Sequence, residues 1–397
     1  MVISAFEGGD TQREMVLLCN ALTARGVAPT ILTLSGKGPL RALLDPSIRV
    51  IEVPGRKLRY AVPGLYWAIG SMAPALVISA EANLNLCTLI AVRSLSRLNR
   101  PKLVLREVGS PSIGQYRDPY RRNRVAYRIL RRLYRHADRI ITSTDGARRD
   151  LADNFAVPER LIAVMRNNAV VPPAMAKQLA YWNGETGREK DLIVCIGRLS
   201  PEKDHGTLLD ALTFLPTQRP WRVAFVGEGP ERERLEALVR KAGLGERTIF
   251  AGYADDPFAW MMRASVAVCC AIYEGLGNGI VEALACGTPV VSTDAPYGPR
   301  EILQAGRYGR LTPVGDTAAM AAAIKAALDD VPNRPMLMSR GLQYTATAAA
   351  ARFLEIIADL QALPLSSRNF RLSGGSIAWP SQRTGRSAVA SSRARSF

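Results

Sequence analysis

The sequence predicts an α/β protein of two domains, each built around a parallel β-sheet. Its 397 residues are enough for two domains of ordinary size, each with its own core. In both halves short apolar runs alternate with amphipathic stretches, which is the order expected of βαβ units. Hydrophobic residues make up 48% of the chain and charged residues 22%, a balance that suits a globular protein.

The first half contains six apolar runs that we expect to form strands. They are VISAF at 2–6, APTILTL at 28–34, RVIEV at 49–53, ALVISA at 75–80, KLVLRE at 102–107 and RIITST at 139–144. Between the first two runs, Met15, Leu18, Cys19 and Leu22 recur at helical spacing, and Gly26 ends that helix.

An uncharged segment at 60–80, YAVPGLYWAIGSMAPALVISA, has the length of a membrane span. Pro63 and Pro74 interrupt it, however, so we expect short elements inside a folded core instead. The N-terminus lacks the charged and apolar regions of a secretory signal. A cytoplasmic location is therefore expected, and the six cysteines, which form no C-x-x-C pair, are expected to be reduced core thiols.

The net charge of +17 is concentrated in RDPYRRNRVAYRILRRLYRHADR, from Arg117 to Arg139, where Asp118 and Asp138 are the acids. Such a block attracts polyanions, and we expect an anionic membrane surface as its partner. Nucleic acid is not expected, because no nucleic-acid-binding motif accompanies the charge. The simpler alternative is a solvated helix face.

Within this block, Tyr127, Leu130, Tyr134 and Ala137 form an apolar stripe at helical spacing. The segment is therefore expected to be a basic amphipathic helix, which either packs onto its domain or lies on a membrane surface.

A polar stretch at 177–191, KQLAYWNGETGREKD, separates the halves. We expect an N-terminal domain at 1–170, a C-terminal domain at 171–363 and a disordered Ser/Arg-rich tail at 364–397. The C-terminal domain repeats the α/β pattern. Its expected strands are LIVCIG at 192–197, RVAFVG at 222–227, TIFAG at 248–252, VAVCCA at 266–271 and PVVST at 289–293, and its expected helices are TLLDALTFL at 207–215, ERLEALVRKAG at 233–243 and IVEALACG at 280–287.

Glycines follow several of these strands, including Gly197, Gly229 and those of EGLGNG. In an open parallel sheet, ligands bind outside the carboxyl ends of the strands, and glycine there lets backbone amides approach an oxyanion. Arg198 and Lys203 lie in the first such loop, GRLSPEKDHG. Two cations beside these amides would neutralise a diphosphate, although a pair of surface cations is the alternative.

The stretch YEGLGNGIVEALACGTPVVSTD, at 273–294, places Glu274 and Glu282 eight positions apart around a glycine-rich turn. In the first turn of its helix, Glu282 could accept two hydrogen bonds from a ribose diol, and Glu274 would lie on the other side of the same ligand. The alternatives are a helix N-terminal acid and an ordinary loop carboxylate.

The second half resembles family 4 of the retaining glycosyltransferases. The resemblance rests on GRLSPEKDHGTLLDAL, FVGEGPERERLEAL, the two glutamates with seven residues between them, APYGPREIL and GRLTPVGD, and it is close over residues 191–316. The first half is similar more loosely. The resemblance implies the GT-B fold, in which two Rossmann-like doubly wound domains face each other across a cleft.

The resemblance also implies roles for individual residues. Arg198, Lys203 and Glu274 would be catalytic, with the two cations on the diphosphate of a nucleotide-sugar. The implied donor-binding residues are Glu282, Gly197, Gly229, Gly277, Asn278, Gly279 and Ile280. The implied acceptor or cleft residues are Gly8, Gly9, Arg13 and Arg106. No metal and no cofactor are expected, since the nucleotide-sugar is a substrate and the sequence has no D-x-D pair at a strand end.

Two positions depart from the family pattern. The motif GGDTQRE is one residue longer before its basic residue than the common G-G-x-E-R, and Val108 stands where many relatives have histidine. Both departures concern the acceptor side, whereas the donor motifs are intact.

The expected function is a retaining glycosyltransferase that moves a hexose or N-acetylhexosamine from a UDP-sugar, in preference to a GDP-sugar, to a lipid-linked saccharide or polysaccharide. It would act on the inner face of the cell membrane. The alternative is a catalytically impaired protein of the same fold that serves as a basic membrane-surface or polyanion-binding adaptor. A nicotinamide-dependent oxidoreductase is disfavoured, because no G-x-G-x-x-G follows the first strand.

Overall fold

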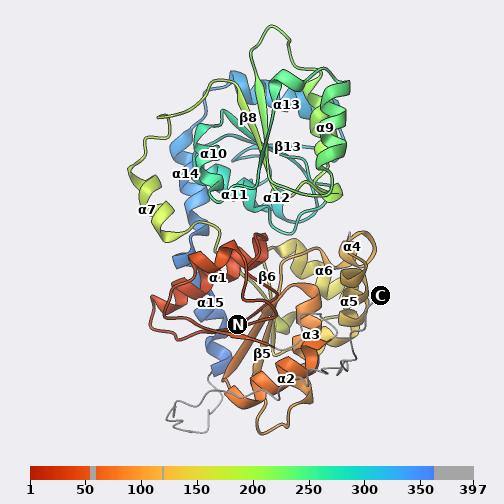
Figure 1. The fold of residues 1–397 in the computed structure, drawn as a ribbon, viewed down its shortest axis with the longest axis vertical. Coiled ribbons are helices and arrows are strands. Elements are labelled where there is room, and N and C mark those ends of the chain that lie inside the picture. Colours follow the sequence, from red (N-terminus) through yellow and green to blue (C-terminus); the bar gives the residue numbers. More distant parts are fainter. Residues whose placement is uncertain (54–59, 119, 362–397) are drawn as a thin grey trace, which may run out of the picture. The chain divides into compact units, whose positions relative to one another are not determined.

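Two separate parallel β-sheets, one in each half of the chain, organise the fold (Figure 1). The computed structural model describes residues 1–53, 60–118 and 120–361, which all belong to one compact unit. The tail at 364–397, expected to be disordered, lies outside the described residues. The two sheets confirm the predicted fold class.

The first sheet has seven strands in the order β3-β2-β1-β4-β5-β6-β7. Their bounds are β1 Val2–Ile3, β2 Thr30–Thr33, β3 Arg49–Glu52, β4 Leu76–Ala80, β5 Lys102–Glu107, β6 Arg139–Thr142 and β7 Ile162–Val164. The six expected strands are all present. The seventh, β7, was not predicted, because a three-residue run is too short to show a period.

Helices cover both faces of the first sheet. They are α1 Asp10–Thr23, α2 Ala61–Met72, α3 Ala82–Ser94, α4 Pro111–Arg117, α5 Arg121–Leu133, α6 Asp145–Phe155 and, from the end of the chain, α15 Ala346–Gln361. In Figure 1, α1 and α15 lie together on the left of this sheet, and α3 and α5 lie on its right. Short 3-10 helices follow at Pro39–Leu43, Tyr134–His136 and Glu159–Leu161.

The uncharged segment at 60–80 folds into helix α2 and strand β4, as its prolines indicated. Pro63 lies in the first turn of α2, where its missing N–H would have had no partner within the helix. Leu65 and Ile69 are buried in the domain. Within the described ranges, no helix is long and apolar enough to cross a membrane.

The second sheet has six strands in the order β10-β9-β8-β11-β12-β13. Their bounds are β8 Leu192–Ile196, β9 Arg222–Val226, β10 Thr248–Gly252, β11 Val266–Cys269, β12 Val290–Thr293 and β13 Arg310–Thr312. The helices of this half are α7 Pro173–Tyr181, α8 His205–Leu212, α9 Arg232–Lys241, α10 Pro257–Arg263, α11 Asn278–Ala285, α12 Gly298–Ile302, α13 Thr317–Asp329 and α14 Arg334–Gly341. Its 3-10 helices are Pro201–Lys203, Gly245–Arg247 and Leu342–Tyr344.

The hydrophobic core changes from one sheet to the other between Ala169 and Val170. The end of the second domain differs from the expected residue 363, however. Helix α15 packs in the first core, where Phe353 joins Phe6 and Met15 of the first half. The alanine-rich sequence of α15 predicts a helix but does not indicate which core it joins, and this is why the expectation was wrong.

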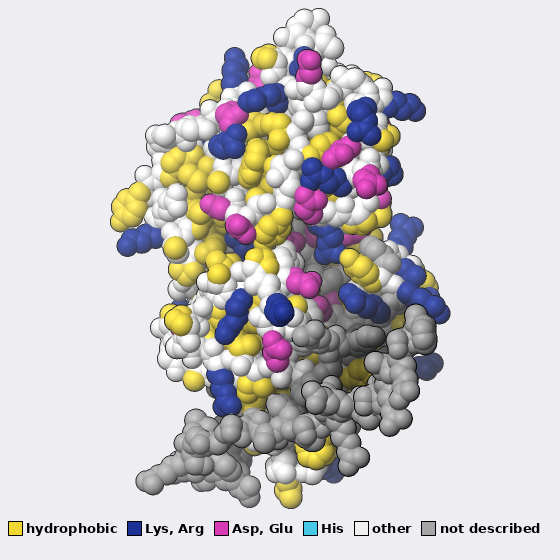
Figure 2. Space-filling model, in the orientation of Figure 1, with side chains coloured by type: hydrophobic (Ala, Val, Ile, Leu, Met, Phe, Trp, Pro, Cys, Tyr) yellow, Lys and Arg dark blue, Asp and Glu magenta, His cyan; other side chains and the backbone are white. Residues whose placement is uncertain are grey.

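Most of the basic block forms α5 and the 3-10 helix Tyr134–His136, and its apolar stripe packs onto the first domain. Tyr127 and Tyr134 are buried, and their hydroxyls donate to the buried carboxylate of Glu107. The opposite face exposes six arginines, Arg121, Arg122, Arg128, Arg131, Arg132 and Arg135. Figure 2 shows Lys and Arg side chains gathered over the region of α5, at the right of the molecule.

Candidate active site

The strand order of the second sheet reverses between β8 and β11, and ligands bind at such a switch point in open α/β sheets. The loops that leave these two strands are joined here, because the amide of Ile272 donates to the carbonyl of Glu202 at 2.9 Å. Arg198 and Lys203 follow β8, and Glu274 follows β11. The topology therefore brings together the three residues predicted to be catalytic.

Lys203 and Glu274 form an ion pair with side chains that are 23% and 20% exposed. Burial lowers the pKa of Lys203, but the charges of Glu274 and Asp10 and the hydrogen bond to Glu274 outweigh it, so this pKa is raised. The ammonium group is consequently charged at neutral pH. It can exchange its carboxylate partner for a phosphate oxygen.

Arg198 is exposed, and its guanidinium lies 3.4 Å from the hydroxyl of Tyr120 at the start of α5. Among the residues that the structure describes, no carboxylate forms an ion pair with Arg198. Its positive charge is therefore available for an anionic ligand.

Glu282 is 5% exposed and accepts a hydrogen bond from Arg13 of α1 at 2.9 Å. Burial raises the pKa of Glu282 to about 7, although the charge of Arg13 opposes the rise. The helix α11 begins at Asn278 and not at the expected Ile280. Glu282 is therefore its fifth residue and lies beyond the first turn, where it was expected.

The glycines of this site serve two purposes. Gly277 has φ 99° and precedes α11, and Gly279 faces the end of β8 near the carbonyl of Ile196. Gly229, by contrast, leaves no room for a Cβ against the backbone of Leu199, so it packs the β9 loop onto the β8 loop. The Ile280 side chain is fully buried in the second core, which leaves only its backbone for a donor.

Gly197 also has a positive φ, of 149°, and a Cβ there would lie 3.9 Å from the Cε of Lys203. Asn278 is the first residue of α11. Gly197 therefore lies beside Lys203, and Asn278 follows Gly277, where a Cβ would lie 3.4 Å from the Cγ of Glu274.

The N-terminal turn of α1 lies beside the donor-side residues. A Cβ on Gly8 would overlap the Tyr253 ring, and Gly9 is the N-cap of α1, one turn before Arg13. Asp10 was missed at the sequence level. Its charge acts on both Lys203 and Glu282, and the acid within GGDTQRE was the available signal.

The structure contradicts the prediction that Arg106 lines the cleft. Its side chain is 1% exposed and pairs with Glu14, which is 4% exposed, on α1. It is the fifth residue of the buried strand β5 and points into the domain. Arg106 therefore cannot contact an acceptor directly in this structure.

Glu301, within GPREIL, was also missed. Its two carboxylate oxygens accept hydrogen bonds from the amides of Asp145 and Gly146 at 3.0 and 2.8 Å, at the start of α6. A carboxylate is stabilised at a helix N-terminus. Glu301 thus ties the second half of the chain to a helix of the first.

A pocket of about 370 Å³ opens next to Glu274. Its walls are mainly apolar and aromatic. They are formed by Ser112, Ile113, Tyr116, Arg117, Ile272, Tyr273 and Pro296. In the described part of the chain, no group of three or more His, Cys, Asp or Glu side chains could hold a metal ion.

Comparison with known proteins decides the family. A profile described as "Glycosyl transferases group 1" matches residues 190–330, and one described as "Glycosyl transferase 4-like domain" matches residues 11–168. The chain belongs to the group 1 glycosyltransferases. As a group 1 glycosyltransferase, it transfers a sugar from a nucleotide-sugar, and the predicted family is confirmed.

Two curated relatives of this group 1 glycosyltransferase act in glycan assembly. The lipopolysaccharide core biosynthesis glycosyltransferase LpsE of Rhizobium meliloti is 27% identical over 88% of this chain and 96% of its own. The N-acetylgalactosamine-N,N'-diacetylbacillosaminyl-diphospho-undecaprenol 4-alpha-N-acetylgalactosaminyltransferase of Campylobacter jejuni is 27% identical over 58% of this chain. That match spans 62% of the Campylobacter protein.

Solved structures confirm the GT-B-like fold of this group 1 glycosyltransferase. Anabaena HepE in complex with UDP has a TM-score of 0.68 at 20% identity and covers 90% of this chain and 99% of its own. WaaG, a glycosyltransferase involved in lipopolysaccharide biosynthesis, has a TM-score of 0.68 at 18% identity and covers 91% of this chain and 99% of its own.

Proposed function

We propose that this glycosyltransferase is a retaining enzyme that transfers a hexose or an N-acetylhexosamine, and that it uses a UDP-sugar in preference to a GDP-sugar. The observation that carries the proposal is the grouping of Arg198, Lys203 and Glu274 at the β8/β11 switch point, with Glu282 on the neighbouring helix. The solved structure of HepE with UDP supports the choice of nucleotide.

In the proposed mechanism, the acceptor hydroxyl attacks the sugar from the face that the nucleotide diphosphate leaves. No carboxylate nucleophile is needed. The protein must instead stabilise the negative charge that develops on the leaving diphosphate, and preorganised cations and amides do this in a partly buried site. Arg198 and Lys203 supply the cations, the amides of Gly277 and Gly279 supply donors, and Glu282 holds the ribose.

The proposed acceptor is a lipid-linked saccharide or a polysaccharide. Two features support it: the Campylobacter relative is named for a diphospho-undecaprenol acceptor, and α5 together with the 3-10 helix that follows it exposes six arginines on one face. Each arginine near an anionic membrane contributes on the order of 1 kcal/mol to binding. We therefore propose that the enzyme works at the inner face of the membrane, held there electrostatically.

The test is transfer of labelled sugar from UDP-glucose, UDP-N-acetylglucosamine and GDP-mannose to a polyprenyl-diphosphate-linked N-acetylhexosamine, with the anomeric configuration of the product read by NMR. A product that keeps the donor's configuration supports the proposal. An inverted product rules out the retaining mechanism. Binding to anionic vesicles without transfer or nucleotide binding would favour the adaptor alternative.

A further inference from the structure

The first sheet has a switch point of its own, and a carboxylate marks it. The strand order reverses between β1 and β4, so the crevice outside their carboxyl ends is a second position where a ligand is expected. Ser4 follows β1 and Glu81 follows β4, and the Ser4 hydroxyl donates to Glu81 Oε1 at 2.9 Å. The two side chains therefore bridge the crevice.

Glu81 is held in an unusual backbone conformation. Its φ is 77° and its ψ is 132°, a region that residues with a Cβ rarely adopt and that glycine occupies at little cost. Glu81 is also the N-cap of α3, yet its side chain does not cap that helix. The strain directs the carboxylate across the end of the sheet instead.

One oxygen of this carboxylate is fixed and the other is open. Oε1 accepts one hydrogen bond from the Ser4 hydroxyl and another from the side-chain amide of Gln12, the latter at 3.0 Å. Oε2 has no hydrogen-bond partner among the described residues. Burial raises the pKa of Glu81, although the hydrogen bond from Ser4 opposes this rise. A partly buried carboxylate with one free oxygen is suited to accept hydrogen bonds from a hydroxylated ligand.

Helix α1 connects Glu81 with the donor side of the site. Gln12 reaches Glu81, and the next residue, Arg13, reaches Glu282 at 2.9 Å. The two carboxylates therefore contact adjacent residues in the first turns of α1. A sugar bound at Glu81 would be a neighbour of the donor nucleotide.

We infer that Glu81 binds hydroxyl groups of the acceptor sugar and thereby determines which acceptor is used. This inference rests on the proposed function, because it needs a saccharide acceptor. Glu81 contributes an acceptor-binding oxygen, Ser4 and Gln12 fix the direction of the carboxylate, and the amide side chain of Asn83, which hydrogen-bonds with Asn123, extends the polar rim.

The experiment compares Glu81→Gln with wild type and with Glu52→Gln as a matched control. Glu52 ends β3 at the same end of the same sheet, but on the edge strand, where it accepts a hydrogen bond from the amide of Gly36 at 2.7 Å. The probes are UDP alone in thermal unfolding, and transfer to a panel of nitrophenyl glycosides and to the polyprenyl-diphosphate-linked N-acetylhexosamine.

We expect Glu81→Gln to raise the acceptor KM about tenfold or more, since hydrogen bonds to charged groups are the stronger ones, and to leave the UDP-induced shift in Tm unchanged. Glu52→Gln should match wild type in both. An acceptor KM within twofold of wild type overturns the inference, as does a parallel loss of UDP binding.

Two further results separate this inference from the proposed function. If wild type uses nitrophenyl glycosides but not the lipid-linked probe, the proposed acceptor is wrong, and a raised KM of Glu81→Gln for the glycosides still supports the role of Glu81. Glu81→Gly should keep or raise Tm, because glycine relieves the strain. A Tm lower by several degrees would show that the glutamate is retained for the fold and would overturn the inference.

Discussion

The guanidinium of Arg13 lies 2.9 Å from Glu282 Oε1 and joins helix α1 of the first half to helix α11 of the second. Glu282 is the residue proposed to bind the ribose, and it is almost fully buried. Breaking a buried ion pair is costly, because it leaves one charge without compensation. A nucleotide that hydrogen-bonds to Glu282 would therefore bind at a contact between two halves of the protein, next to Arg13.

The first prediction concerns the pH dependence of nucleotide binding. The pKa of Glu282 is about 7, and the ionised form is the better acceptor for a ribose diol. The affinity for UDP should therefore rise as the pH increases from 6 to 8. In Glu282→Gln this rise should be smaller, because only the ionisation of the UDP terminal phosphate, with a pKa of about 6, remains, and in Arg13→Ala its midpoint should move to higher pH. Titration calorimetry across this range provides the measurement, and a wild-type profile identical to that of Glu282→Gln would contradict it.

The second prediction concerns stability. The pKa of Glu282 is raised on folding, from 4.5 to about 7, so the folded chain binds more protons than the unfolded chain between these values. The contribution of this group to stability consequently falls as the pH rises through that window, by up to about 3 kcal/mol.

The free energy of unfolding of Glu282→Gln, measured relative to wild type, should thus be higher at pH 8 than at pH 4.5. Urea unfolding at both values measures this. Glu159→Gln is the control, because its side chain is 70% exposed and should show no such change.

The third prediction concerns Lys203. Lys203→Ala should lower kcat on the order of 10²-fold or more, because one preorganised charge at a developing oxyanion contributes that much. Lys203→Arg should retain part of the activity. Lys325→Ala, which removes a lysine that is 58% exposed from a surface pair with Asp329, should have the wild-type rate. An unchanged kcat in Lys203→Ala would exclude Lys203 from the reaction.

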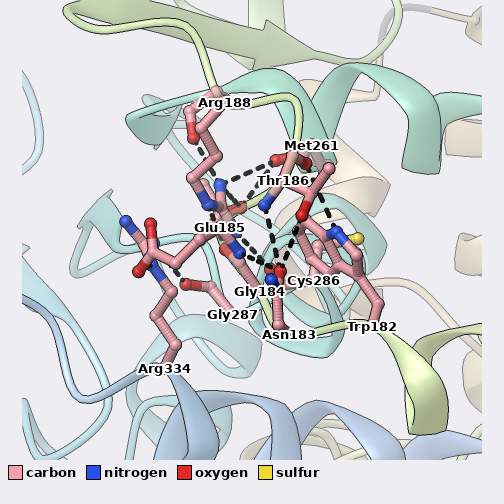
Figure 3. Close-up of polar contacts among 12 residues, drawn as sticks. Trp182, Asn183, Gly184, Glu185, Thr186, Arg188, Met261, Cys286, Gly287 and Arg334 are labelled. Atoms are coloured by element: carbon pink, nitrogen blue, oxygen red, sulfur yellow. Dashed lines mark hydrogen bonds and ion pairs between the residues drawn. The ribbon is translucent and has the colours of Figure 1, made fainter.

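The fourth prediction concerns Arg188, which joins the 182–188 segment to two helix ends. Its guanidinium donates to the carbonyls of Gly184, Met261, Ala264 and Cys286 and to the hydroxyl of Thr288. Figure 3 shows Arg188 pointing into this group of carbonyls near the Trp182 ring. The pKa of Arg188 is lowered to about 10, chiefly by burial, so it stays charged at neutral pH.

Arg188→Ala should lower the free energy of unfolding by about 3 kcal/mol, since it leaves several partly buried carbonyls without partners. The control is Arg222→Ala, whose side chain is 50% exposed and pairs with Glu189, and it should change stability by less than about 1 kcal/mol. Chemical denaturation distinguishes the two. Equal losses would show that the Arg188 contacts contribute no more than a surface pair.

The sequence was sufficient to place Arg198, Lys203 and Glu274 at one edge of the second sheet, because the switch-point loops carry them in short motifs, and their role in donor binding stays a prediction. Arg198 and Lys203 follow one strand, Glu274 follows another, and parallel strands bring the ends together without further information. Arg106 could not be placed in this way. Helices cover both faces of this sheet, so the alternation of residues along β5 does not show whether the Arg106 side chain is buried. Its partner Glu14 is also far away in the sequence.

The positions of α15 and Glu301 could not be predicted either, because they also depend on contacts between residues far apart in the sequence. Helix α15 returns to the first core because its apolar face fits α1, and Glu301 caps α6 across more than 150 residues. Such long-range choices depend on tertiary packing and leave no local pattern. Glu81 was also overlooked, because a glutamate with positive φ has no signal in the sequence.

The most direct test of the central claim is thermal unfolding of the wild type and of Glu282→Ala with UDP, GDP or ADP. A nucleotide at one hundred times its Kd should stabilise the wild type by about 2.7 kcal/mol. UDP should raise the Tm of the wild type more than GDP or ADP does, and Glu282→Ala should lose this shift. An equal shift in Glu282→Ala would contradict the ribose-binding role of Glu282, and a larger shift with GDP would contradict the proposed donor.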